Sequence, residues 1–139
     1  IDPIADEDDN DAYYDPILNT RENNGLLYSD VGYRRAIASF NRAARHAAHS
    51  FEQAARQGNS DAQYNLGVLY DEGRGVSQNY RLAAQWYRKA AQQGFISAQY
   101  NLGNLYRDGK GVPQNAYIAR DWQEKAAAQG HEAARAALE

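Results

Sequence analysis

The chain contains a 36-residue sequence repeat that occurs twice in succession. Residues 60–95 align without gaps to residues 96–131, and 20 of the 36 positions are identical. Apolar residues recur at the same spacing on both sides of this stretch. A fixed period in the thirties is typical of helical solenoids, in which each unit buries its apolar face only against its neighbours. The repeat therefore predicts an all-α chain.

Each unit is predicted to fold as a helix, a glycine loop and a second helix. In the first unit, Ala62 and Leu66 belong to one apolar stripe at helical spacing. Ser60 and Gln63 have the spacing of a capping box, which predicts that the first helix starts there. The second helix is expected to begin near Asn79.

Glycine stands at two kinds of position in both units. In the loops it flanks a basic residue, as Gly-Arg-Gly at 73–75 and Gly-Lys-Gly at 109–111. A phosphate-binding P-loop needs Ser or Thr after the basic residue and a preceding strand. We therefore interpret these loops as hinges whose basic side chains point into solvent. Gly67 and Gly103 lie inside first helices, where glycine costs about 1 kcal/mol relative to alanine, so we expect a neighbouring helix to approach them closely.

Three segments are expected along the chain. Residues 1–30 form an acidic, mostly irregular arm, and residues 31–58 form one long helix, because their apolar residues alternate steps of three and four. The second half of this helix occupies the second-helix position of an incomplete unit and caps the solenoid. Residues 59–139 form the repeat domain, which ends in a half repeat at 132–139, either a native cap or a truncated unit.

The unit resembles the Sel1-like repeat (SLR) family, a branch of the tetratricopeptide-type α/α solenoids. The resemblance covers about residues 60–138 and is carried by these segments: AQYNLGVLYDEGRGV (62–76), AAQWYRKAAQQG (83–94), AQYNLGNLYRDGKGV (98–112) and ARDWQEKAAAQG (119–130). It implies an α/α right-handed superhelical solenoid of two full helix-loop-helix repeats. It also implies a protein-binding role in the bacterial envelope or outside the cell.

The resemblance implies that first helices line a concave, partner-binding face. Positions that differ between the two units are freer to serve a partner, such as Val68 against Asn104 and Asp71 against Arg107. Asn and Gln side chains there can bind a peptide backbone, and Tyr can act as an aromatic anchor or belong to the core. The predicted partner-binding residues are Gln63, Tyr64, Asn65, Val68, Asp71, Gln99, Tyr100, Asn101, Asn104 and Arg107.

Charge is unevenly distributed along the chain. Residues 1–20 hold seven acidic and no basic residues, although the net charge of the whole chain is only −3. We expect this acidic arm either to be solvated or to dock on a basic surface of the chain itself or of a partner. The net negative charge of the chain argues against nucleic-acid binding. No cysteine is present for a disulfide or thiolate site, and no apolar run approaches the ~20 residues of a membrane span.

We expect a non-enzymatic interaction module or adaptor that binds a protein or peptide in its concave face without a cofactor. A periplasmic immunity protein that neutralises a secreted toxin is an alternative. An alternative from another class is an enzyme or metal-binding protein that uses His46, His49 and Glu52, which share helical spacing. The resemblance favours a periplasmic or secreted location, and a start at Ile1 agrees either with a removed signal peptide or with a shortened chain.

Overall fold

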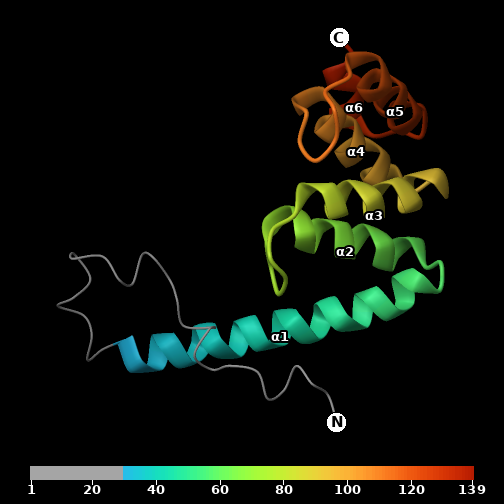
Figure 1. Ribbon diagram of the computed structural model, residues 1–139. Helices are drawn as coiled ribbons and strands as arrows, with labels where there is room; N and C mark the ends of the chain where they lie inside the picture. The colour runs from blue at the N-terminus through green and yellow to red at the C-terminus, as the bar shows by residue number, and fades with distance from the viewer. Residues whose placement is uncertain (1–29) are drawn as a thin grey trace.

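The computed structural model describes residues 30–139, and the expectations for the acidic arm fall outside that range. Within it, all regular secondary structure is helical. Figure 1 shows the helices stacked on one another in chain order, which agrees with the predicted all-α solenoid. They are α1 (Asp30–Arg56), α2 (Ser60–Glu72), α3 (Tyr80–Gln92), α4 (Ile96–Asp108), α5 (Ala116–Ala128) and α6 (Glu132–Ala137).

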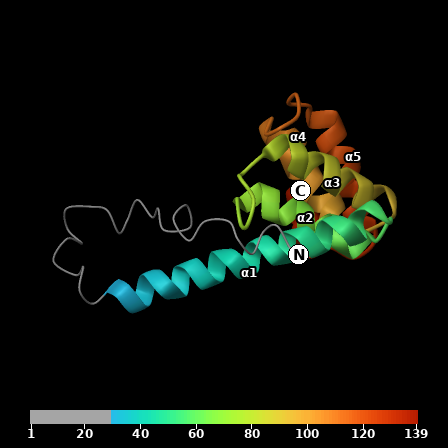
Figure 2. The ribbon, with the colours of Figure 1, turned by 60° about the horizontal axis from the view of Figure 1, so that its bottom comes forward.

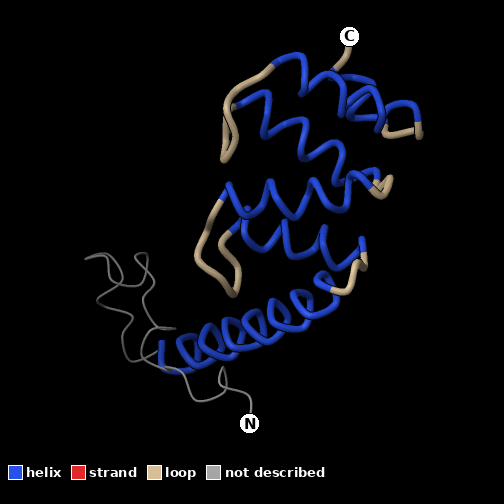
Figure 3. The backbone as a smooth tube through the Cα atoms, turned by 45° about the vertical axis from the view of Figure 1, so that its right-hand side comes forward, coloured by secondary structure: helices blue, strands red, loops and turns tan. Residues whose placement is uncertain are grey.

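The first helix is much longer than the others. The long helix predicted over 31–58 corresponds to α1, which has 27 residues, whereas α2 to α5 have 13 each. Figure 2 shows that the N-terminal part of α1 extends beyond the rest of the stack. In Figure 3 the long glycine loops lie on one side of the stack and the short turns between units lie on the other.

Asparagine side chains cap the N-termini of both helices of the first unit, α2 and α3. The Oδ1 atom of Asn59 accepts a hydrogen bond at 2.9 Å from the backbone N–H of the third residue of α2. Asn79 makes the same contact at 3.0 Å with the third residue of α3, as expected from the predicted start. The capping-box interpretation of Ser60 and Gln63 is wrong, because the Gln63 side chain points into the interior, where the residue is 4% exposed.

The second glycine of each hinge packs directly on the backbone of an earlier helix. A Cβ atom on Gly75 would lie 2.7 Å from the Arg45 nitrogen and still closer to the Ala44 carbonyl group in α1. A Cβ on Gly111 would meet the backbone of Tyr80 in α3 in the same way. Positions 44 and 80 are one repeat apart, so α1 takes the second-helix position of an incomplete unit, as α3 does in the complete one.

The glycines inside the first helices also face a close neighbour, as predicted. A Cβ on Gly67 would lie 2.6 Å from the ring of Tyr87, and one on Gly103 would lie 2.8 Å from Cγ of Gln123. Both neighbours belong to the second helix of the same unit. Glycine therefore allows the paired helices to approach more closely than alanine would.

The basic hinge residues are exposed, but they do not simply point into solvent as expected. The guanidinium carbon of Arg74 lies 5.5 Å from the ring centroid of Phe40, and the Lys110 ammonium lies 5.4 Å from that of Tyr80. Both rings belong to the second-helix layer of the preceding unit. These cation–π contacts add a favourable interaction between neighbouring units.

The hydrophobic core runs along the stack as a series of small clusters. Tyr87, Leu66 and Leu102 are the largest fully buried side chains, and most other buried apolar residues are alanines. One cluster joins α1 to α2, one is centred on α3 and α4, and one joins α5 to α6. Because alanine is short, these helices pack at close distance, and each unit depends on its neighbours for burial.

We predict that Gly111→Ala lowers the free energy of unfolding by about 3 kcal/mol or more. The residue has φ +72° and its new Cβ would clash with backbone that has no freedom to move aside. Gly94→Ala is the matched control, since Gly94 has φ +89° but nothing within 4 Å of its Cβ position. The control should cost only about 1–2 kcal/mol. Equal losses in urea denaturation would contradict the proposed backbone contact.

Candidate functional site

Two of the predicted partner-binding residues, Gln63 and Gln99, lie in the interior, each 4% exposed. The Gln63 Nε2 donates to the Ala55 carbonyl at 3.1 Å, and its Oε1 accepts from Gln93 Nε2 at 2.8 Å. The Gln99 amide makes the same two contacts one unit later, with a carbonyl of α3 at 3.2 Å and with Gln129 at 2.8 Å. These two glutamines therefore join neighbouring helices and do not face a partner.

The two predicted aromatic anchors also contact the last residue of their own unit, which is the N-cap of the helix that follows. The ring centroid of Tyr64 lies 4.9 Å from that of Phe95, and the ring of Tyr100 stacks on His131 at 4.4 Å. Phe95 and His131 are equivalent positions at the starts of α4 and α6. Both tyrosines are half-buried. Their rings are therefore part of the contact between units, and only their exposed edges are open to a partner.

The structure brings three of the predicted residues, Asp71, Asn101 and Asn104, together. They line a hollow of about 180 Å³ between α2 and α4. Sequence reasoning missed the other three lining residues, which are Leu105, Asp108 and Lys110. We call this site the α2–α4 hollow. Small-molecule sites typically measure ~300–1,000 Å³, so a hollow of this size suits a side chain of a partner.

Asp71 is held in the α2–α4 hollow by a buried tyrosine. The Tyr87 hydroxyl donates to Oδ2 of Asp71 at 3.0 Å, and Tyr87 is 1% exposed. Burial, followed by the negative charge of Asp71, raises the pKa of Tyr87 far above its usual value of 10.0. The hydroxyl therefore remains a hydrogen-bond donor and fixes the position of the carboxylate.

A different polar pair occupies the equivalent place in the second unit. Gln123 replaces Tyr87, and its Nε2 donates to Oδ1 of Asn104 at 2.9 Å. The shorter Gln side chain contacts position 104, whereas Tyr87 reaches Asp71, which is equivalent to position 107. Packing therefore couples three differences between the units: Val68 against Asn104, Asp71 against Arg107, and Tyr87 against Gln123. The sequence held a signal for this coupling, because all three positions change together.

The remaining predicted residues do not line the α2–α4 hollow. The Arg107 guanidinium contacts both carboxylate oxygens of Asp108 at 3.1 and 3.3 Å. This pairing raises the pKa of Arg107 and lowers that of Asp108. Arg107 also borders a larger hollow of about 420 Å³ beside α5 and α6. Val68 packs against the core, and Asn65 is half-buried on α2.

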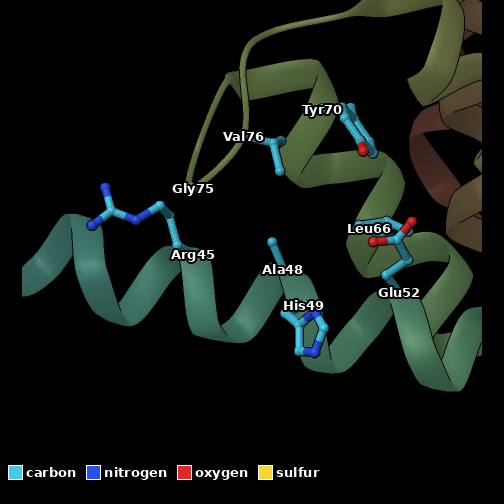
Figure 4. Close-up of a pocket in the computed structure, with 8 residues that line it drawn as sticks. All are labelled: Arg45, Ala48, His49, Glu52, Leu66, Tyr70, Gly75 and Val76. Atoms are coloured by element: carbon cyan, nitrogen blue, oxygen red, sulfur yellow. The ribbon is translucent and has the colours of Figure 1, made fainter. Parts of the chain in front are cut away.

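A second small hollow lies between α1 and α2. It contains His49 and Glu52, two of the three residues of the metal-binding alternative. Figure 4 shows that its lining side chains, including His49 and Glu52, come from α1, α2 and the hinge after α2. His49 Nε2 is 2.8 Å from the amide of Gln53, and Glu52 accepts from Arg56 at 2.8 Å. Among residues 30–139, no group of three His, Asp or Glu side chains is placed to hold one ion. The structure gives no support to a site at His46, His49 and Glu52.

Comparisons with known proteins agree with this architecture. A family model described as Sel1 repeat matches residues 42–59, 60–95 and 96–131. The solved structure of a Sel1 repeat protein from Oxalobacter formigenes is 45% identical, with a TM-score of 0.62, over 63% of this chain and 66% of that chain. The first segment of the family match falls in α1, which agrees with the contact between α1 and the hinge glycine.

Two further solved structures are similar. Protein c5321, a protective antigen present in uropathogenic Escherichia coli strains and displaying an SLR fold, is 40% identical, with a TM-score of 0.64. That match covers 65% of this chain and only 19% of the antigen. Cysteine rich protein B (hcpB) of Helicobacter pylori shares the fold at 22% identity and a TM-score of 0.61, over 86% of this chain and 98% of its own.

No curated protein matches the chain. No helix between residues 30 and 139 is both long and apolar enough to cross a membrane. The expected periplasmic or secreted location stays a prediction.

We predict that Gln99→Leu lowers the free energy of unfolding by about 2 kcal/mol, because the Ala91 carbonyl loses one of its hydrogen bonds and the Gln129 amide loses its partner. The control is Gln92→Leu, which changes an exposed residue at the end of α3 and should cost less than about 0.5 kcal/mol. Thermal and urea unfolding measure both. Similar stability of the two variants would show that the Gln99 bonds do not support the stack.

We predict that Tyr87→Phe changes the alkaline stability of the protein. Tyr87 ionises near pH 10 when unfolded, but its raised pKa keeps it protonated in the folded chain. Its stabilising contribution is therefore complete below pH 10 and is lost as the pH rises towards the folded pKa. The stability gap between wild type and Tyr87→Phe should narrow by up to about 1.4 kcal/mol per pH unit above 10.

Urea unfolding between pH 8 and pH 11 measures this gap. Tyr117→Phe serves as the control, because Tyr117 is 87% exposed. Its unfolding free energy should follow that of the wild type at every pH. If the unfolding free energies of wild type and Tyr87→Phe changed with pH in parallel, the pKa of Tyr87 would not be raised in the folded chain.

Proposed function

Because the chain belongs to the Sel1 repeat family, we propose that it is a non-enzymatic interaction module that binds a segment of a protein partner at the α2–α4 hollow. Sel1 repeat proteins are in general protein–protein interaction modules. The observation that carries the proposal is the convergence of Asp71, Asn101 and Asn104, from two successive first helices, on one hollow.

The polar groups of this hollow suit an extended peptide segment. Asn104 accepts a hydrogen bond from Gln123 through its Oδ1, which leaves its amide N–H groups available as donors. Asn101 lines the same hollow, and its side-chain amide offers both N–H donors and a carbonyl acceptor. One donor and one acceptor side by side can satisfy a peptide group of a bound backbone.

We predict that the double variant Asn101→Ala, Asn104→Ala folds like the wild type but loses at least tenfold in partner capture. The double change removes the proposed backbone contacts and the bond to Gln123, which should cost about 1 kcal/mol of stability. Circular dichroism and thermal melting test the fold. Capture by the immobilised chain from a native lysate of the source organism tests binding.

The matched control is the double variant Arg81→Ala, Gln85→Ala, which alters exposed residues of α3 outside the hollow. It should capture the same partner as the wild type. If the Asn101 and Asn104 changes leave capture intact while the control reduces it, the binding surface lies on the second helices and the proposal is wrong.

A further inference from the structure

The strongest charge feature of the α2–α4 hollow is Asp71. Its carboxylate is half-buried and accepts a hydrogen bond from the fully buried hydroxyl of Tyr87. A hydroxyl supplies a hydrogen bond but no positive charge. Among the ion pairs within residues 30–139, none joins Asp71 to a cation. Asp71 is therefore a positioned negative charge that has no ion-pair partner among the described residues.

The other two charged groups of the hollow already have partners. Asp108 pairs with Arg107, which contacts both of its oxygens and lowers its pKa. The Lys110 ammonium lies over the ring of Tyr80, 5.4 Å from the centroid. Asp71 is thus the charged group of the hollow that has neither an ion-pair partner nor an aromatic ring against it within residues 30–139.

We propose, on the basis of the proposed function above, that the α2–α4 hollow accepts a Lys or Arg side chain of the partner. The cation pairs with Asp71, while Asn101 and Asn104 bind the backbone on either side of it. A hollow of about 180 Å³ matches one long side chain. A neutral residue in its place would desolvate Asp71 without compensating its charge, so the arrangement selects for a cation.

The second unit indicates that this preference applies to a single position of the bound segment. The residue equivalent to Asp71 is Arg107, which carries the opposite charge and is neutralised by Asp108. Gln123, in place of Tyr87, bonds Asn104 and does not hold a carboxylate. The two units therefore cannot bind the same side chain, and one basic residue fixes the register of the partner along the stack.

Selection of random peptides displayed on phage tests this inference. The full chain is immobilised, and selected peptides are resynthesised for affinity measurement by fluorescence anisotropy. We expect a Lys or Arg at one fixed position of the enriched peptides. Replacing that residue by Gln, or replacing Asp71 by Asn in the protein, should weaken binding at least tenfold. Asp71→Asn keeps an oxygen that can accept from Tyr87, so the fold is retained.

Glu72→Gln is the matched control. It removes the same charge from the next residue, which is exposed and pairs with Arg74 outside the hollow. Peptide affinity should change less than twofold. A loss with Glu72→Gln equal to that with Asp71→Asn would indicate a general charge effect and would overturn the inference.

Two other outcomes separate the inference from the proposed function. Peptides that lack a basic residue but are weakened by Asn101→Ala and Asn104→Ala would overturn the role of Asp71 and leave the binding face in place. Peptides that are indifferent to all changes in the hollow, or the absence of any selected peptide, would overturn both.

Discussion

The stack depends on the contact between each hinge glycine and the backbone of an earlier second helix. Gly75 sits on α1 at Ala44, and Gly111 sits on α3 at Tyr80, with no room for a Cβ atom at either place. The contact is made between main chains, so it fixes how far each unit lies from the one before it. Because α1 offers the same backbone as α3, it takes the second-helix position immediately before α2 within residues 30–139.

Side chains at equivalent positions in the two units also hold neighbouring helices together, and these side chains are part of the interior. Gln63 and Gln99 bridge neighbouring helices through buried hydrogen bonds of their amides. Tyr64 and Tyr100 pack their rings against Phe95 and His131, the N-caps of the next helices. Polar and aromatic groups that resemble a binding surface in the sequence are thus part of the interior. The surface of α2 and α4 that we propose for a partner is the hollow around Asp71.

Comparing the sequences of the two units separates identical positions from differing ones, and the packing shows what each kind of position does. Gln63 and Gln99 are identical in both units, which in a repeat protein indicates a role in the fold. The positions that differ, such as Asp71 and Arg107, were predicted to serve a partner. Their differences are also coupled to the exchange of Tyr87 for Gln123 in the facing helix. Variation between units therefore reflects packing and is not by itself a sign of binding.

By itself, the sequence determined the repeat period, the helical fold and the glycine hinges, because all three arise from local patterns that recur every 36 residues. It also placed Asp71, Asn101 and Asn104 on neighbouring first helices. Only the tertiary structure decided which polar side chains turn inward. The amide of Gln63 is buried because Gln93, 30 residues away, reaches it, and the Asp71 carboxylate is fixed because Tyr87 meets it from another helix. Such contacts depend on how helices pack, and periodicity along one chain does not encode them.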